Sequence, residues 1–161
     1  MKSFLKYWLP LLIWLGVIFL GSTSLMSAEH TSRLIVPILL WLKPGMSPKA
    51  IWIILLVARK CAHVTEYAVL ALLLWRALRN VPVLHTKTLM VFGAVLLGCA
   101  LFAASDEFHQ TFVKSRTSSV CDVLLDVAGA FLGLLIGASF ARRRPKKFRA
   151  TTHNQVVDAQ L

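Results

Sequence analysis

Polar and titratable side chains interrupt three of the four long apolar stretches in this 161-residue sequence. Such side chains cost roughly 2.5–3.5 kcal/mol each at the centre of a lipid-facing helix, so they normally face protein and mark a functional site. Their carboxylates and imidazoles suit acid–base chemistry, and their cations suit phosphate or carboxylate. The candidate ligand-binding residues are Arg59, Lys60, His63, Glu66, Tyr67, Asp106, Glu107, His109, Gln110, Arg116, Asp122 and Asp126, of which His63, Asp106, Glu107 and Asp122 are candidates for catalysis.

Positions along the expected helices place these residues at a similar height. Counted from the basic residue at the inner end of each helix, Arg59 is 17 positions away, Asp106 is 19 and Asp122 is 20. At about 1.5 Å per residue these separations are roughly 25–30 Å, close to the thickness of a bilayer core. His63 and Asp126 are 13 and 16 positions away, so the polar groups are expected to descend as a pocket from the outer face.

Helical spacing also predicts that these side chains converge. Arg59, His63 and Glu66, with the neighbouring Tyr67, occupy one side of a helix. On the last helix Asp122 and Asp126 continue into glycines at every fourth position, Gly129, Gly133 and Gly137. Such a glycine stripe permits close helix contact, so the two aspartates should point inward as well.

The composition identifies lipid as the solvent of the elements that carry these groups. The sequence is 57% hydrophobic and 16% charged, with a mean hydropathy of +0.69, whereas soluble domains are about 45–50% apolar and about 25% charged. We therefore predict an all-α integral membrane four-helix bundle, with helices over 7–22, 48–78, 88–108 and 119–141 forming one domain of residues 1–141. A short interfacial or re-entrant segment, 34–42, is expected between the first two helices.

The distribution of lysine and arginine predicts the orientation. The formal net charge is +11, but a basic run over 142–149 directly follows an apolar stretch, which favours anionic phospholipid over nucleic acid as its partner. With both termini in the cytoplasm, basic residues number 11 on the inner side and 5 on the outer side. The chain is therefore expected to be a multi-pass protein of the inner (cytoplasmic) membrane, with a basic and then polar cytoplasmic tail over 142–161.

Little in the sequence points to a cofactor or to redox chemistry. Cys61, Cys99 and Cys121 are widely spaced and lie in or beside apolar stretches, so they are expected to be small buried side chains. No cofactor and no metal is predicted, although a site of His63, His109 and Asp106 is a conceivable alternative. The first apolar stretch could be a signal peptide, but we interpret it as a membrane helix. The oligomeric state is left open.

Two polar patterns resemble the VanZ-like family of small membrane proteins, over about residues 59–137. The residues that carry the resemblance are Lys60, His63 and Tyr67, the string Ser105-Asp106-Glu107-Phe108-His109-Gln110, and then Phe112, Arg116, Asp122, Asp126 and Gly129. The sequence departs from the family pattern at Asp126, where many members are expected to have asparagine, and at Lys114 and Ser115, which replace a Pro-Gly turn.

The family is named for a protein associated with low-level resistance to teicoplanin-type glycopeptides. The resemblance implies a multispan envelope protein with one polar site that contains Lys60, His63, Tyr67, Asp106, Glu107, Gln110, Arg116 and Asp122.

Three functions fit these features. The first is an outward pocket that binds the head group of a lipid or lipid-linked cell-wall precursor, with 34–42 as a lid received by the apolar stretch 51–57. The second is an intramembrane enzyme that acts on such a lipid by carboxylate and histidine acid–base chemistry. The third is a structural or interaction protein whose polar groups tie helices together.

Overall fold

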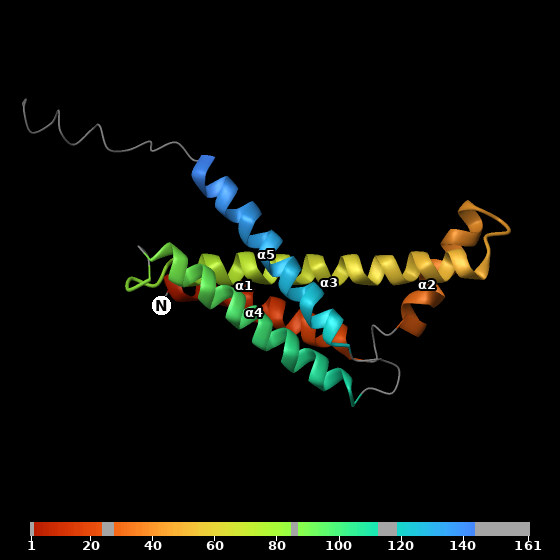
Figure 1. Ribbon diagram of the computed structural model, residues 1–161, viewed down its shortest axis with the longest axis horizontal. Helices are drawn as coiled ribbons and strands as arrows, with labels where there is room; N and C mark the ends of the chain where they lie inside the picture. The colour runs from red at the N-terminus through yellow and green to blue at the C-terminus, as the bar shows by residue number, and fades with distance from the viewer. Residues whose placement is uncertain (1, 24–27, 85–86, 113–118, 144–161) are drawn as a thin grey trace, which may run out of the picture.

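The computed structural model describes residues 2–23, 28–84, 87–112 and 119–143, and these contain helices and no strands (Figure 1). Five helices follow one another in this described part of the chain: α1 (Lys2–Ser22), α2 (Ala28–Leu42), α3 (Pro48–Leu78), α4 (Thr88–Gln110) and α5 (Val120–Arg143). The all-α expectation is therefore confirmed for the described part of the chain.

The longest helix, α3, begins and ends at clear local signals. Ser47 has an extended backbone and its hydroxyl accepts from the amide of Ala50 at 3.3 Å, while Pro48 occupies the first turn. This arrangement is favourable because serine satisfies a free amide and proline has none to satisfy. At the other end the amide of Arg79 donates to the carbonyl of Trp75 at 3.0 Å.

Within the ranges that the structure describes, three helices are long and apolar enough to cross a membrane: Phe4–Ser22, Thr88–Gln110 and Val120–Phe140. The sequence predicted four such helices. The additional one, α3, has 31 residues but carries Arg59, Lys60 and Glu66 near its middle. Large apolar side chains cover the surface of the helices, with Leu89 86% and Phe140 67% exposed. Together these features indicate a membrane protein.

Glycines of α5 bring this helix against the backbone of α3. A Cβ added at Gly129 would come within 2.9 Å of the Val64 Cα, and one at Gly133 within 2.8 Å of the Ala68 Cα. Real Cβ atoms do not approach so closely, so only glycine permits this contact. Both pairs have the same offset of 65 positions, and α3 and α5 therefore run parallel in one register.

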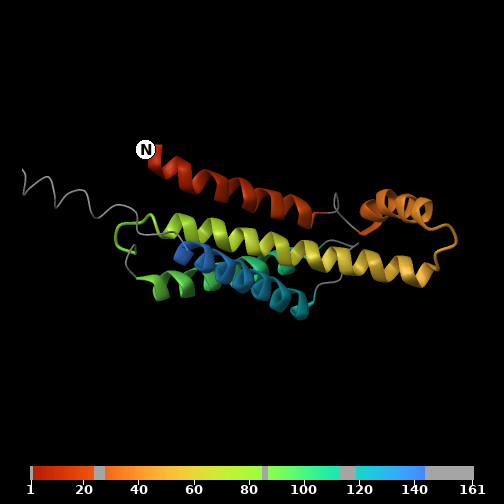
Figure 2. The same cartoon turned by 90° about the horizontal axis from the view of Figure 1, so that it is seen from above.

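The remaining helices pack around this pair, with α4 against α3 and α5, and α1 against α3 and α4 (Figure 2). Leu11 and Ile18 of α1 are buried, and Trp14 Nε1 donates to the backbone carbonyl of Glu66 at 2.9 Å. The buried core consists of Tyr67, Leu70, Ala71, Val91, Val95, Cys99, Ala130 and Leu134, among others.

An arm, formed by α2 and the first part of α3 and comprising residues 28–57, extends past the ends of α1 and α4 (Figures 1 and 2). The turn between its helices contains Gly45, whose φ of +83° is a conformation that favours glycine. The segment 34–42, expected to be interfacial or re-entrant, forms the second part of α2, a 15-residue helix with Pro37 inside it. It contacts α3, and Trp41 and Trp52 of the arm are 81% and 63% exposed.

The expectation for the cysteines was correct only for Cys99. Cys99 is fully buried in the core, whereas Cys61 and Cys121 are exposed on α3 and α5. An apolar sequence neighbourhood does not distinguish the inward from the outward face of a membrane helix, because both faces are apolar.

Candidate functional site

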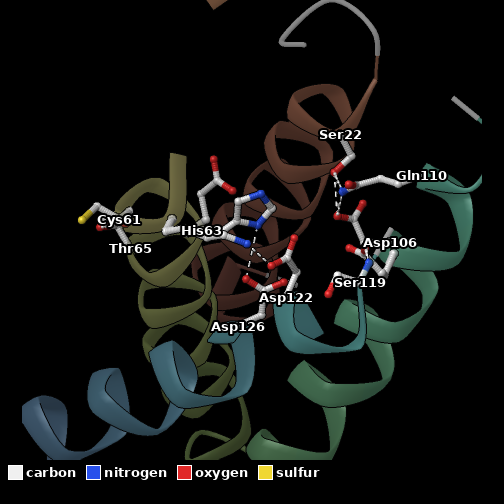
Figure 3. A network of polar contacts seen from close by, with 12 residues as sticks. Ser22, Cys61, His63, Thr65, Asp106, Gln110, Ser119, Asp122 and Asp126 are labelled. Carbon is white, nitrogen blue, oxygen red and sulfur yellow. Dashed lines mark hydrogen bonds and ion pairs between the residues drawn. The ribbon is translucent and has the colours of Figure 1, made fainter. Parts of the chain in front are cut away.

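A layer of buried polar side chains lies where α1 and α4 end and α5 begins, between four helices (Figure 3). We call it the polar layer. Its buried members are Ser22, His63, Asp106, Glu107, Gln110, Asp122 and Asp126. Burial of such groups in an otherwise apolar protein is tolerated only when they have partners.

One part of the polar layer joins α1 to α4. The hydroxyl of Ser22 donates to Asp106 Oδ2 at 2.6 Å, and Gln110 Nε2 donates to the same oxygen at 3.0 Å. Gln110 also lies 3.4 Å from the Ser22 hydroxyl. Because Asp106 and Gln110 are one helical turn apart, the two side chains share a face of α4. This network therefore orients one carboxylate oxygen of Asp106.

A second part joins α3 to α5 through two ion pairs. Lys60 Nζ contacts Asp122 Oδ1, and His63 Nδ1 lies 3.3 Å from Asp126 Oδ1. The side chains of the second pair are 11% and 3% exposed. The glycine contacts set the register that brings these residues together, because Asp122 and Asp126 lie on the face of α5 that continues into Gly129 and Gly133.

Glu107 has a different role from the rest of the layer. Its Oε1 accepts from the backbone amide of Ser119, the residue that precedes α5. The hydroxyl of Ser119 accepts from the amide of Cys121 at 3.2 Å. Free amides and a partial positive charge at a helix start favour a carboxylate there. Glu107 thus caps α5, which accounts for its burial without a ligand.

Several buried polar atoms in and beside the layer have no hydrogen-bond partner among the described residues. They are His63 Nδ1, Tyr67 Oη, Asp106 Oδ1, His109 Nδ1 and Asp126 Oδ1. His63 and Asp126 lie at ion-pair distance but are not aligned for a hydrogen bond. These atoms come from α3, α4 and α5 and could donate to or accept from a polar group that enters the layer.

Other predicted site residues lie at the margin of the polar layer. Arg59 and Glu66 are half-buried on α3, and Glu66 Oε1 lies 4.0 Å from the position of a Cβ on Gly21. The ring of His109 packs against Phe19 at 5.1 Å. Tyr67, by contrast, is fully buried and packs against Phe102.

Arg116, Lys114 and Ser115 lie outside the described residues. Among the described residues no three histidine, cysteine, aspartate or glutamate side chains are arranged to hold a metal ion. The alternative of a metal site at His63, His109 and Asp106 therefore has no geometric support.

Sequence reasoning missed Ser22, Trp14 and Ser119, which hold the site residues in place. Ser22 could be read as the small residue of a signal-peptide cleavage site, but it is 3% exposed and bonded to Asp106. Its position at the end of the first apolar stretch, level with the other polar residues, was the signal that could have identified it.

A lateral groove lies beside the polar layer, on the surface between α3 and α5. Its volume is about 360 Å³, and its lining is Leu56, Val57, Lys60, Cys61, Val64, Thr65 and Leu125. Of the predicted site residues it includes Lys60 alone, and the groove is otherwise mostly apolar.

Comparison with known proteins gives one match. The family model described as VanZ/LLP1 matches residues 7–141, which contain all five helices except the first residues of α1 and the last of α5. No curated protein and no solved structure matches the chain.

Proposed function

We propose that this chain, which belongs to the VanZ/LLP1 family of membrane proteins, binds the head group of a lipid or lipid-linked cell-wall precursor in its polar layer. The proposal includes four spans of the cytoplasmic membrane, formed by α1, α3, α4 and α5. Both termini are on the inner side, and the polar layer is near the outer face. The basic residues after α5 would then meet anionic phospholipid.

The observation that carries this proposal is the set of buried polar atoms without partners on three helices. A buried polar group that lacks a hydrogen bond costs about 1–3 kcal/mol, so the unpaired Tyr67 Oη, Asp106 Oδ1 and His109 Nδ1 favour a polar ligand there. Asp106 Oδ1 and Asp126 Oδ1 are acceptors suited to the hydroxyl or amine groups of a lipid head. Tyr67 Oη can both donate and accept.

Cations at the margin of the layer suit the phosphate of such a lipid. Arg59 is half-buried on α3, and the side chain of Lys60 is 39% exposed while it pairs with Asp122. The lysine ammonium group has three donor hydrogens, so Lys60 can contact a phosphate while it remains paired with Asp122. Arg116 would add a bidentate donor. A link to glycopeptide resistance, the association for which the family is named, would follow if the bound lipid were a cell-wall precursor.

An intramembrane enzyme is the second candidate, because the buried side chains of His63 and Asp126 lie within ion-pair distance of each other. The carboxylate beside the imidazole resembles the arrangement that lets histidine act as a general base. Tyr67 lies one turn along the same face of α3 and could act as an acid on the same ligand. A lipid that is chemically changed by the protein would distinguish this candidate from binding alone.

Substitution Asp106→Asn is expected to reduce the amount of a defined co-purified lipid by about tenfold. The change keeps the size of the side chain but removes the charge, which is worth roughly 1–3 kcal/mol for a buried acceptor. Mass spectrometry of lipids extracted from wild-type and variant protein measures the effect. Thr111→Val is the matched control, because Thr111 is exposed one residue beyond Gln110 and bonds only to the local Phe108 carbonyl.

An unchanged lipid profile in Asp106→Asn would contradict the proposed function and would favour a structural role for the layer. Recovery of a lipid with a cleaved or transferred head group from wild-type protein, and of the intact lipid from the variant, would favour the enzyme.

A further inference from the structure

The lateral groove is built from two neighbouring rows of α3 and one residue of α5. Leu56, Lys60 and Val64 form one row at intervals of four, and Val57, Cys61 and Thr65 form the other, facing Leu125. Residues four apart lie on one face of a helix, so the groove follows the helix axis for about 14 Å.

The groove opens on the outside of the helices and continues along the arm. The same rows of α3 extend outward to Trp52 and Ile53, which are 63% and 45% exposed. Leu56 and Val57 are 39% and 51% exposed. In a membrane-spanning protein such a surface is reached from the acyl-chain region, without passing through water.

Lys60 connects the groove to the polar layer. It is the charged member of the groove lining, and its ammonium pairs with Asp122 of the layer. A cation at the side of an apolar channel matches a molecule with a hydrocarbon chain and a negative head, since lysine binds phosphate as a point charge.

We infer that the lateral groove holds an acyl chain of an anionic phospholipid, whose phosphate contacts Lys60. This inference rests on the proposed function and adds the path by which the lipid reaches the polar layer. The lipid approaches from the side, between α3 and α5. The acyl chain lies along Val64, Thr65 and Leu125, and the head group sits where Lys60 and Asp122 meet.

A tryptophan that fills the groove tests the inference directly. Thr65→Trp is expected to weaken binding of phosphatidylglycerol by about tenfold, because a bulky ring displaces several methylene groups of the acyl chain from the groove. Native mass spectrometry of delipidated protein, titrated with phosphatidylglycerol or phosphatidylcholine, measures binding. Ala62→Trp is the matched control, since Ala62 is exposed on α3 but does not line the groove.

The role of Lys60 is tested with a charge-neutral double variant, Lys60→Met with Asp122→Asn, which leaves no unpaired charge. Wild-type protein is expected to prefer phosphatidylglycerol over phosphatidylcholine, and the double variant is expected to lose that preference. Equal binding of both lipids by wild-type protein would overturn the assignment of an anionic lipid.

A native cysteine provides a second measurement that needs no variant. Cys61 lies in the groove, and Cys121 is exposed outside it. Phosphatidylglycerol should slow modification of Cys61 by a membrane-permeant maleimide severalfold and leave Cys121 unaffected. Equal slowing of both cysteines, or of neither, would contradict occupation of the groove.

Failure of this inference can be told from failure of the proposed function. If Thr65→Trp binds phosphatidylglycerol as the wild type does while Asp106→Asn loses its lipid, the groove is not the site and the polar layer is. If Thr65→Trp loses phosphatidylglycerol while Asp106→Asn keeps its full lipid profile, lipid binding in the groove is supported and a head-group site in the polar layer is rejected.

Discussion

Gly133→Ala is expected to lower the free energy of unfolding by about 3 kcal/mol or more. The added methyl would lie 2.8 Å from the Ala68 Cα and even closer to the Ala68 carbonyl oxygen. Overpacking costs about 1–3 kcal/mol where side chains can move, but here the obstacle is the backbone of α3. The two helices must therefore separate, which also moves the ion pairs that depend on their register.

Unfolding in mixed detergent micelles, followed by tryptophan fluorescence, measures this effect. Gly93→Ala is the matched control, because Gly93 lies inside α4 and a Cβ there would meet nothing within 4 Å. That change should stabilise the protein by about 0.5–1 kcal/mol, since alanine favours a helix over glycine. Equal effects of the two substitutions would show that α5 does not approach α3 closely.

His63→Leu is expected to cost about 3 kcal/mol, because it leaves the Asp126 carboxylate buried without its neighbour. The side chain of Asp126 is 3% exposed, and the imidazole nitrogen lies 3.3 Å away. Removal of one member of a buried ion pair costs about 3–5 kcal/mol, most of it from the stranded charge. The same unfolding measurement reports the loss.

A double-mutant cycle separates the pair from the packing of each side chain. Asp126→Leu together with His63→Leu should recover about 2 kcal/mol relative to the single His63 variant, since two apolar side chains need no partners. Additive losses in the double variant would mean that the two groups do not interact. Lipid retention should be lost in the His63→Leu variant and in the double variant alike, although the double variant regains stability. Stability and lipid binding can therefore be told apart.

Much of the helical framework could be predicted from the sequence. The range 48–78 is that of α3 in the structure, because Ser47 and Pro48 signal its start, and the other three predicted helices differ from α1, α4 and α5 by a few residues at their ends. The fifth helix, α2, was expected only as a short segment over 34–42. The glycine stripe indicated close contact, and α5 does lie against α3. Such features are encoded within a single helix, so local patterns reveal them.

Features that depend on pairs of helices could not be predicted in the same way. Ser22 lies 84 positions from Asp106 and their bond is invisible in either segment alone. The hydrogen bond between Glu107 and the backbone amide of Ser119, at the start of α5, is likewise invisible in either segment alone. The lateral groove is lined by α3 together with Leu125 of α5, and apolar periodicity does not show which face of a membrane helix turns outward.

The pairing of Lys60 with a residue 62 positions later has a consequence for biogenesis. When α3 leaves the ribosome, the carboxylates that neutralise it have not yet been synthesised, and insertion of each bare charge is costly. We expect α3 to remain beside the translocon or at the headgroup level until α5 arrives. In a nascent chain ended at residue 112, Cys61 of α3 should then react with a water-soluble maleimide faster than in the full chain; equal rates would contradict this order of insertion.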